Sequence, residues 1–249
     1  MTVHRLAVWA AVLPIAALVT WDAPPLAPPG PAAEPERPLP AVERPTPAPA
    51  VVGRDEWDAD EGLRTEPVTY TGAARAVFIH HTNHPDDYDC ADAPEMLRSM
   101  HSDHVSAQGW DDLGYNFVVD KCGTVYEGRG GGADRYVLGA HTTGFNMDSV
   151  GIAALGAFTD PSAVPPALVQ AIAEVAAWKL RPGSDPRGRV RMVSTNDNSR
   201  VPEGDPAELD VVSGHRDIVP TDCPGDALYA QLPTIREEAA RLRVAEGIQ

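Results

Sequence analysis

Residues 213–225, with the sequence SGHRDIVPTDCPG, restrict what this chain can fold into more than any other stretch. His215 and Cys223 lie eight positions apart, and Pro220 between them rules out a continuous helix. A loop that doubles back would bring the imidazole and the thiol to one point. Neutral histidine nitrogen and cysteine thiolate are both ligands of zinc, so the stretch indicates half of a metal site.

A third ligand has to come from elsewhere in the chain. His80 and His81 stand together at the end of Arg75–Ile79, an apolar run with the pattern of a strand. Adjacent strand residues face opposite ways, so the pattern alone does not decide which histidine points toward the loop. A single histidine or cysteine is more often a packed core residue. The group of His80, His215 and Cys223 together favours a metal site.

The rest of the chain alternates between helical and strand-like patterns. We expect helices at Ala93–Gln108, Pro165–Leu180 and Ala227–Val244, and further strands at Gly114–Asp120, Thr124–Gly128 and Ser149–Phe158. Residues 181–210 are loop-rich, with one short strand expected at Arg189–Val193. Strands mixed with covering helices predict a layered α/β domain.

The first 50 residues do not belong to that domain. Residues 1–22 hold an apolar run, Leu6–Val19, which is too short to span a bilayer comfortably and is typical of a signal-peptide core. The cleavage site is poorly marked, so an uncleaved N-terminal anchor is an alternative, and a buried helix is another. Residues 23–50 are rich in proline and alanine and predict an extended linker. The folded domain is expected at residues 51–246.

Charge and cysteine content narrow the partners and the compartment. The formal net charge of −16 argues against a nucleic acid or an anionic membrane surface as partner. If Cys223 is a metal ligand, Cys90 and Cys122 remain as a disulfide pair in an exported protein. The alternative is two free thiols. We expect a secreted or cell-wall-associated protein, a monomer with no membrane domain unless the N-terminal segment is retained.

Five motifs follow one another in order: IHHT at 79–82, GWDDLGYNF at 109–117, DKCGTVYEGR at 120–129, GAHT at 139–142 and GHRD at 214–217. Together they resemble the family of peptidoglycan-recognition proteins and type 2 N-acetylmuramoyl-L-alanine amidases, over roughly residues 51–240. The resemblance implies a single domain with a mixed, mostly five-stranded sheet flanked by helices. It also implies Zn²⁺ in a surface cleft.

The resemblance assigns roles to individual residues. The positions that match the zinc ligands are His80, His215 and Cys223, and the first histidine of the pair is preferred to His81. Three protein ligands leave the fourth position on the metal open for water, as in catalytic sites. Tyr115 matches the catalytic tyrosine, with packing in a strand as the alternative. Thr221 matches an oxyanion-stabilising position, with a turn residue as the alternative. The positions that match substrate-binding residues are His81, Thr82, His104, His141 and Asn146.

Other positions stay open or follow no family motif. His104 could equally lie at the edge of the core, and His84 and His101 match nothing, so we expect both to be exposed to solvent. Glu127 and Arg129 match family residues but fit an ion pair or a turn as well as ligand contact. Gln108 stands where some recognition proteins carry a basic residue, which leaves the preference for diaminopimelate or lysine in the stem peptide undecided.

The function implied is hydrolysis of the amide between N-acetylmuramic acid and L-alanine in peptidoglycan by an exported zinc enzyme. One alternative is a recognition module of the same fold that binds the muropeptide without cutting it. A second alternative, a structural zinc site, needs a fourth ligand, and the sequence offers no compelling one.

Overall fold

The computed structural model describes residues 46–160 and 164–245. The expected signal or anchor at 1–22, and most of the linker expected at 23–50, lie outside these residues. Within the described ranges, no helix has both the length and the apolar character needed to cross a bilayer.

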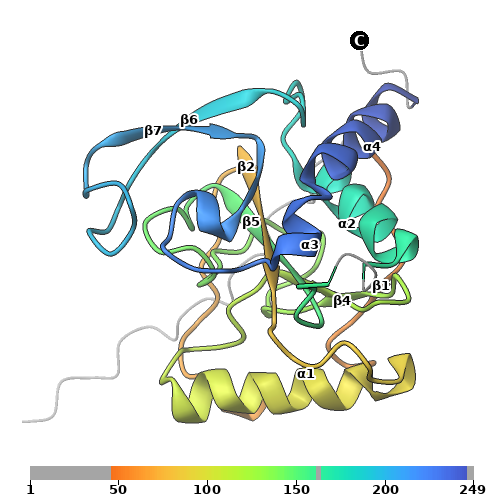
Figure 1. The fold of residues 1–249 in the computed structure, drawn as a ribbon. Helices are drawn as coiled ribbons and strands as arrows, with labels where there is room; N and C mark the ends of the chain where they lie inside the picture. The colour runs from red at the N-terminus through yellow and green to blue at the C-terminus, as the bar shows by residue number, and fades with distance from the viewer. Residues whose placement is uncertain (1–45, 161–163, 246–249) are drawn as a thin grey trace, which may run out of the picture. The chain divides into compact units, whose positions relative to one another are not determined.

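A six-stranded mixed sheet forms the centre of the domain (Figure 1). The strands are, in spatial order, β1 (Val51–Val52), β4 (Val125–Glu127), β3 (Phe117–Val119), β5 (Ser149–Ala154), β2 (Ala76–His81) and β8 (Val212–Gly214). Within this sheet, only β3 and β4 pair antiparallel. The expected α/β class and mixed sheet are confirmed. The sheet has one strand more than the resemblance implies, and its edge strand β1 is only two residues long.

The register of β2 and β8 explains how distant residues meet. The two strands are parallel, and Ile79 pairs with Gly214. The chain therefore reaches His80 on β2 and His215 after β8 at the same edge of the sheet. Carboxyl ends of parallel strands are where open α/β sheets place their sites.

Helices cover both faces of the sheet. On one face α1 (Ala93–Ser102) packs against Val118 and Leu155, with Leu97 fully buried between them. On the other face α2 (Pro166–Lys179) and α4 (Leu232–Ala245) pack together over the larger core (Figure 1). Residues of β3 alternate between the two clusters, so Phe117 and Val119 belong to the larger one and Val118 to the smaller.

Two helices differ from the sequence prediction. The helix expected at Ala93–Gln108 continues beyond Ser102 as a π-helical turn, Asp103–Ala107. The helix expected at Ala227–Val244 is two helices, α3 (Asp226–Tyr229) and α4. The second helix begins one residue before Pro233, a residue that suits the first turn of a helix and not its interior.

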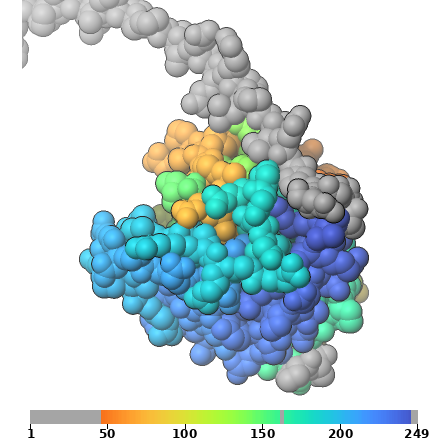
Figure 2. Space-filling model, turned by 90° about the horizontal axis from the view of Figure 1, so that it is seen from above, coloured from red at the N-terminus to blue at the C-terminus, as the bar shows by residue number. Residues whose placement is uncertain are grey.

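The segment expected to be loop-rich contains a second, two-stranded sheet. β6 (Arg189–Val193) coincides with the short strand predicted there, and its antiparallel partner is β7 (Pro206–Asp210). The prediction missed β7 because the strand begins with proline and alternates weakly. The hairpin, light blue in Figure 2, lies on the opposite side from the dark-blue α4. Two backbone hydrogen bonds hold the loop between β6 and β7 to the rest of the domain. Thr195 N donates to Gly144 O at 2.9 Å, and Arg200 N donates to Ile218 O at 2.7 Å.

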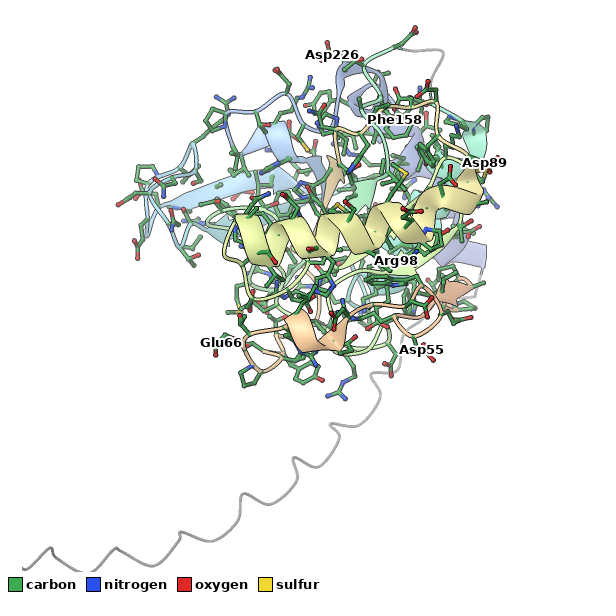
Figure 3. All side chains as sticks on the ribbon, turned by 90° about the horizontal axis from the view of Figure 1, so that it is seen from below. Asp55, Glu66, Asp89, Arg98, Phe158 and Asp226 are labelled. Carbon is green, nitrogen blue, oxygen red and sulfur yellow. A yellow bond between two sulfur atoms is a disulfide. The ribbon has the colours of Figure 1, made fainter. Side chains whose placement is uncertain are left out.

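Helix α1 is fixed to neighbouring segments at two points. Cys90, just after the Asp89 labelled in Figure 3, forms a disulfide with Cys122, as expected, and Cys223 is free. Farther along the helix, Arg98 Nη1 donates to Trp57 O at 2.8 Å. α1 is thus tied both to the turn between β3 and β4 and to the segment that follows β1.

Candidate metal centre

His80, His215 and Cys223 meet at the carboxyl edge of the sheet. Each contributes one ligand atom, and these three atoms lie within 4.8 Å of one another. His80 Nδ1 is 3.7 Å from Cys223 Sγ, and the rings of His80 and His215 are 4.4 Å apart at their centroids. Zinc–nitrogen and zinc–sulfur bonds at a tetrahedral angle place such ligand atoms about 3.5 Å apart. The spacing therefore fits one zinc ion.

The protonation states of the three groups also fit a cation. Burial, and next the neighbouring His215, lower the pKa of His80 well below its ordinary value. Burial lowers the pKa of His215 to about 4, so both imidazoles offer lone pairs at neutral pH. Burial raises the pKa of the Cys223 thiol to about 12, although the backbone N–H of His81 faces the sulfur at 3.3 Å. Such a buried thiol requires a bound cation to become a thiolate ligand.

His81 turns away from this group. Its Nδ1 is 2.6 Å from Ala157 O, a distance at which the ring nitrogen donates to the carbonyl. The structure therefore brings His80, and not its neighbour, to His215 and Cys223. The alternation of side chains along β2 separates the two histidines.

Thr142 lies behind the metal-facing histidine. Its Oγ1 is 3.2 Å from His80 Nε2 and 2.9 Å from His141 Nδ1, and its side chain is fully buried. In the tautomer whose Nδ1 lone pair faces Cys223, Nε2 carries the ring proton and donates a hydrogen bond to Thr142 Oγ1. Burial lowers the pKa of His141 to about 3, so that ring is neutral and can accept from the threonine hydroxyl.

His141 occupies a space that two glycines provide. A Cβ on Gly151 would lie 2.3 Å from His141 Cγ, and one on Gly139 would lie 2.4 Å from Cδ2. The ring thus rests against the backbone of β5 and against its own loop. Asn146 Oδ1 fixes that loop by accepting from His141 N at 3.0 Å and Thr142 N at 2.8 Å.

Tyr115 lies beside the three ligands. Its ring centroid lies 5.2 Å from that of His80, and its hydroxyl is 3.5 Å from His81 O. Burial raises the pKa of Tyr115 above its ordinary value, so the phenol stays an O–H donor at neutral pH.

Thr221 makes the contact of a turn residue. Its Oγ1 accepts from the backbone N–H of Cys223 at 3.2 Å, which leaves the hydroxyl proton of the threonine free to donate elsewhere.

The remaining expected binding residues differ in exposure. His81, Thr82 and Asn146 are partly exposed, whereas His104 and His141 are buried at 6 % exposure. His104 Nδ1 accepts from Gly114 N at 3.2 Å, and its ring lies 4.5 Å from that of Trp110.

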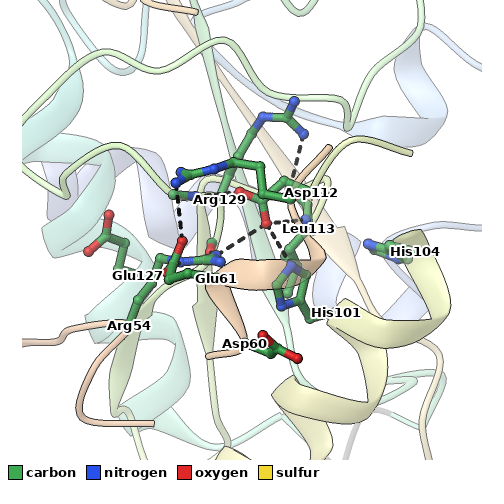
Figure 4. A network of polar contacts seen from close by, with 12 residues as sticks. Arg54, Asp60, Glu61, His101, His104, Asp112, Leu113, Glu127 and Arg129 are labelled. Carbon is green, nitrogen blue, oxygen red and sulfur yellow. Dashed lines mark hydrogen bonds and ion pairs between the residues drawn. The ribbon is translucent and has the colours of Figure 1, made fainter. Parts of the chain in front are cut away.

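His84 and His101 do not have the exposure that the sequence suggested. His84 is half-buried, and its Nδ1 is 2.8 Å from Thr82 Oγ1. His101 is buried, with Nε2 2.9 Å from Asp112 Oδ1 (Figure 4). Sequence reasoning missed this pair because Asp112 lies in a loop that returns to α1. Its one signal was the helical spacing of His101 four residues after Leu97 on the inner side of the helix.

Asp112 is the centre of a buried polar network. Arg54 Nη1 lies 3.3 Å from its carboxylate, and the backbone N–H groups of Leu113 and Gly130 donate to it at 2.7 and 2.9 Å (Figure 4). Nearby, Arg129 pairs with Asp111, and Glu127 Oε1 accepts from Gly132 N at 2.8 Å. An ion pair and a turn thus account for both of these family-matched residues.

This network makes stability depend on pH. Burial raises the pKa of Asp112, but His101, then Arg54 and two backbone N–H groups, outweigh it and lower the pKa to about 2. A depressed folded-state pKa stabilises the fold above the unfolded value near 4, and that stability is lost as pH falls toward 2. We expect Asp112→Asn to remove roughly 2 kcal/mol of this acid-dependent stability. Urea unfolding of parent and variant at several pH values between 2 and 6 measures the free energy of unfolding. If that free energy depended on pH equally in both proteins, Asp112 would not be the source of the pH dependence.

Comparisons with known proteins identify the family to which the chain belongs. The profile of the Amidase_2 family, N-acetylmuramoyl-L-alanine amidase, matches residues 70–226. The chain belongs to this family. It is 35% identical over 189 residues to a pig N-acetylmuramoyl-L-alanine amidase, covering 75% of this chain and 27% of the relative. The chain thus spans about a quarter of that amidase's length.

Peptidoglycan-recognition proteins are relatives over most of their length. The SC2 protein of Drosophila simulans is 30% identical over 185 residues, covering 74% of this amidase-family chain and 85% of the relative. A mutant of Drosophila PGRP-LB, solved in complex with tracheal cytotoxin, superposes with a TM-score of 0.55 at 25% identity, covering 74% of this chain and 93% of that one. The family resemblance read from the five motifs is confirmed.

Proposed function

We propose that this chain is a zinc-dependent amidase that cleaves the bond between N-acetylmuramic acid and L-alanine in peptidoglycan. The observation that carries the proposal is the meeting of His80, His215 and Cys223 beside the hydroxyl of Tyr115. Among the described residues, no fourth histidine, cysteine or carboxylate joins this group. Three protein ligands with an open position are typical of catalytic rather than structural zinc.

The bound zinc would supply Lewis acidity, lowering the pKa of a water molecule and polarising the scissile carbonyl. The chain's own groups then complete the site. Tyr115, protonated because it is buried, can donate to the oxygen that gains negative charge. Thr221 can add a second hydroxyl donor from the same loop as Cys223. Thr142 holds the ring of His80 with Nδ1 turned toward Cys223.

Substrate contact would fall to the partly exposed residues of the expected set, His81, Thr82 and Asn146. His104 and His141 are buried, so in this proposal they pack behind the partly exposed residues and offer the muropeptide little surface of their own. We further propose that the domain acts outside the cell as a monomer. The Cys90–Cys122 disulfide, which suits an oxidising compartment, supports export.

A recognition module without activity is the second candidate, because relatives named as peptidoglycan-recognition proteins match this chain. The experiment that separates the two follows a soluble muropeptide by mass spectrometry in the presence of the zinc-loaded chain. An amidase converts it to free sugar and free peptide, with one water added. A recognition module binds it and leaves its mass unchanged.

Thr142 gives a prediction that concerns the metal alone. Thr142→Val keeps the shape of the side chain but removes the acceptor for His80 Nε2–H, and we expect zinc affinity to fall about 10–100-fold. Thr142→Ser keeps the hydroxyl and should retain most of the affinity. Competition with a chelator of known affinity measures both variants. Equal zinc affinity in the valine variant and the parent would mean that Thr142 does not orient His80.

A further inference from the structure

A polar hollow lies at the end of the sheet opposite the metal centre. It has a volume of about 390 Å³, and its lining includes Arg75, Arg181, Ser184, Arg189 and Val211. Arg75 directly precedes β2, whereas His80 is the fifth residue of that strand. At about 3.3 Å per residue, the two positions are separated by roughly 16 Å of extended chain. The hollow is therefore separate from the proposed catalytic cleft.

Backbone pairing places two of the arginines side by side. Ala74 and Leu180 form a parallel bridge, and Arg181 N donates to Ala74 O at 2.9 Å. Residues that follow a parallel pair share a side of the two strands, so Arg75 and Arg181 project in the same direction. Like charges at neighbouring positions repel each other unless an anion lies between them.

The carboxylates near the hollow are already engaged. Asp185 is paired with Arg187 at 3.0 Å, and Asp210 is paired with Arg189 at 3.3 Å and with Arg236 at 2.8 Å. The lining of the hollow holds more arginines than acidic residues. This local excess of positive charge stands out because the whole chain has a net charge of −16.

Arg75 and Arg181 lack an acidic partner. Among the described residues, no carboxylate lies within ion-pair distance of either guanidinium. Arg75 Nη2 donates to Arg191 O at 2.7 Å, but its Nε is buried and has no hydrogen-bond partner. Arg181 Nε makes one long contact, 3.4 Å, to Ser184 Oγ. A buried donor without an acceptor is unfavourable. Because this Nε has almost no accessible surface, the Arg75 guanidinium would turn further into the hollow for an oxyanion there to supply the acceptor.

We propose that this hollow is a binding site for a phosphate group. Two guanidinium groups and the Ser184 hydroxyl together offer several donors in one hollow, which suits the several oxygens of a tetrahedral anion better than a planar carboxylate. The phosphate belongs either to a free small anion or to a phosphodiester polymer. Figure 2 looks onto this region, where the teal residues near 181–190 lie beside the dark-blue α4.

The test measures binding of inorganic phosphate and of a glycerol-phosphate oligomer to the full chain, by calorimetry at low salt. We expect saturable binding that weakens at least 10-fold in Arg75→Gln and in Arg181→Gln. Arg241→Gln is the control, because it removes the same charge from an arginine on α4 whose side chain is 61% exposed. Tighter binding of the oligomer than of phosphate identifies a polymer as the ligand. Equal affinity per phosphate identifies a small anion.

Two results would overturn the site. Either Arg241→Gln weakens binding as much as the pocket variants do, which means a general charge effect, or the pocket variants bind like the parent. Arg181 is exposed, so its variant should fold normally even if the partly buried Arg75 proves sensitive. Thermal unfolding without phosphate checks this. Cleavage of a soluble muropeptide should be unchanged in Arg181→Gln, so this site and the proposed amidase activity can fail independently.

Discussion

Cys223→Ser is expected to lose zinc and, with it, all measurable amidase activity. Serine replaces a thiolate ligand by a neutral hydroxyl at the same position, 3.7 Å from His80 Nδ1 in the parent. Loss of a partner that only orients a ligand costs about 10–100-fold in metal affinity, and loss of the ligand itself should exceed this range. Metal analysis after dialysis and competition with a chelator give the occupancy and the affinity.

The control for Cys223→Ser is a variant that lacks the other two cysteines, Cys90 and Cys122. Cys90→Ser combined with Cys122→Ser removes the disulfide and leaves the three ligands in place. That double variant should be less stable, by about 2–4 kcal/mol, but should still bind one zinc per folded chain. If Cys223→Ser held zinc as tightly as the parent, the metal centre described here would be wrong.

Tyr115→Phe should separate catalysis from binding. The change deletes one hydroxyl and keeps the ring that packs 5.2 Å from His80, so fold and zinc content should be nearly unchanged. If the hydroxyl donates to the developing oxyanion, turnover should fall by about 10²-fold or more. Muropeptide affinity should change far less, because this donor matters most in the transition state.

The measurement compares parent and variant at equal zinc occupancy, with turnover and muropeptide binding recorded separately. A fall in turnover with unchanged affinity supports the assigned role. Unchanged turnover would make Tyr115 a packing residue of the region before β3. Loss of both turnover and zinc would instead mean that the hydroxyl supports the metal centre.

The sequence was sufficient for the fold class and for the convergence of the metal ligands. The apolar run ending at His80 predicts a buried strand, and the proline-rich loop from His215 to Cys223 has to double back. What the pattern could not decide was the choice between His80 and His81. That choice depends on the register of β2 against β5 and β8, which is set by pairing across the sheet and not by local sequence.

Other features depend on contacts that are far apart in the chain. His101 is buried because Asp112 returns to it from a loop, and a histidine on a helix gives no sign of such a partner. Thr142, in the loop that precedes β5, contacts His80 across a sequence separation of 62 residues. In the sequence alone, Thr142 has the pattern of an ordinary turn residue. The strand β7 was missed because its first residue is proline, which is tolerated at the start of an edge strand.

The most direct test of the central claim uses the full chain on purified peptidoglycan. Free alanine amino groups and new reducing sugar ends are counted together, first with zinc bound, then after chelation, then after zinc is restored. An amidase frees alanine amino groups without producing reducing ends, stops on chelation and recovers with zinc. Peptidoglycan that is bound while its alanine stays blocked in the zinc-loaded sample would contradict the account and identify a recognition module.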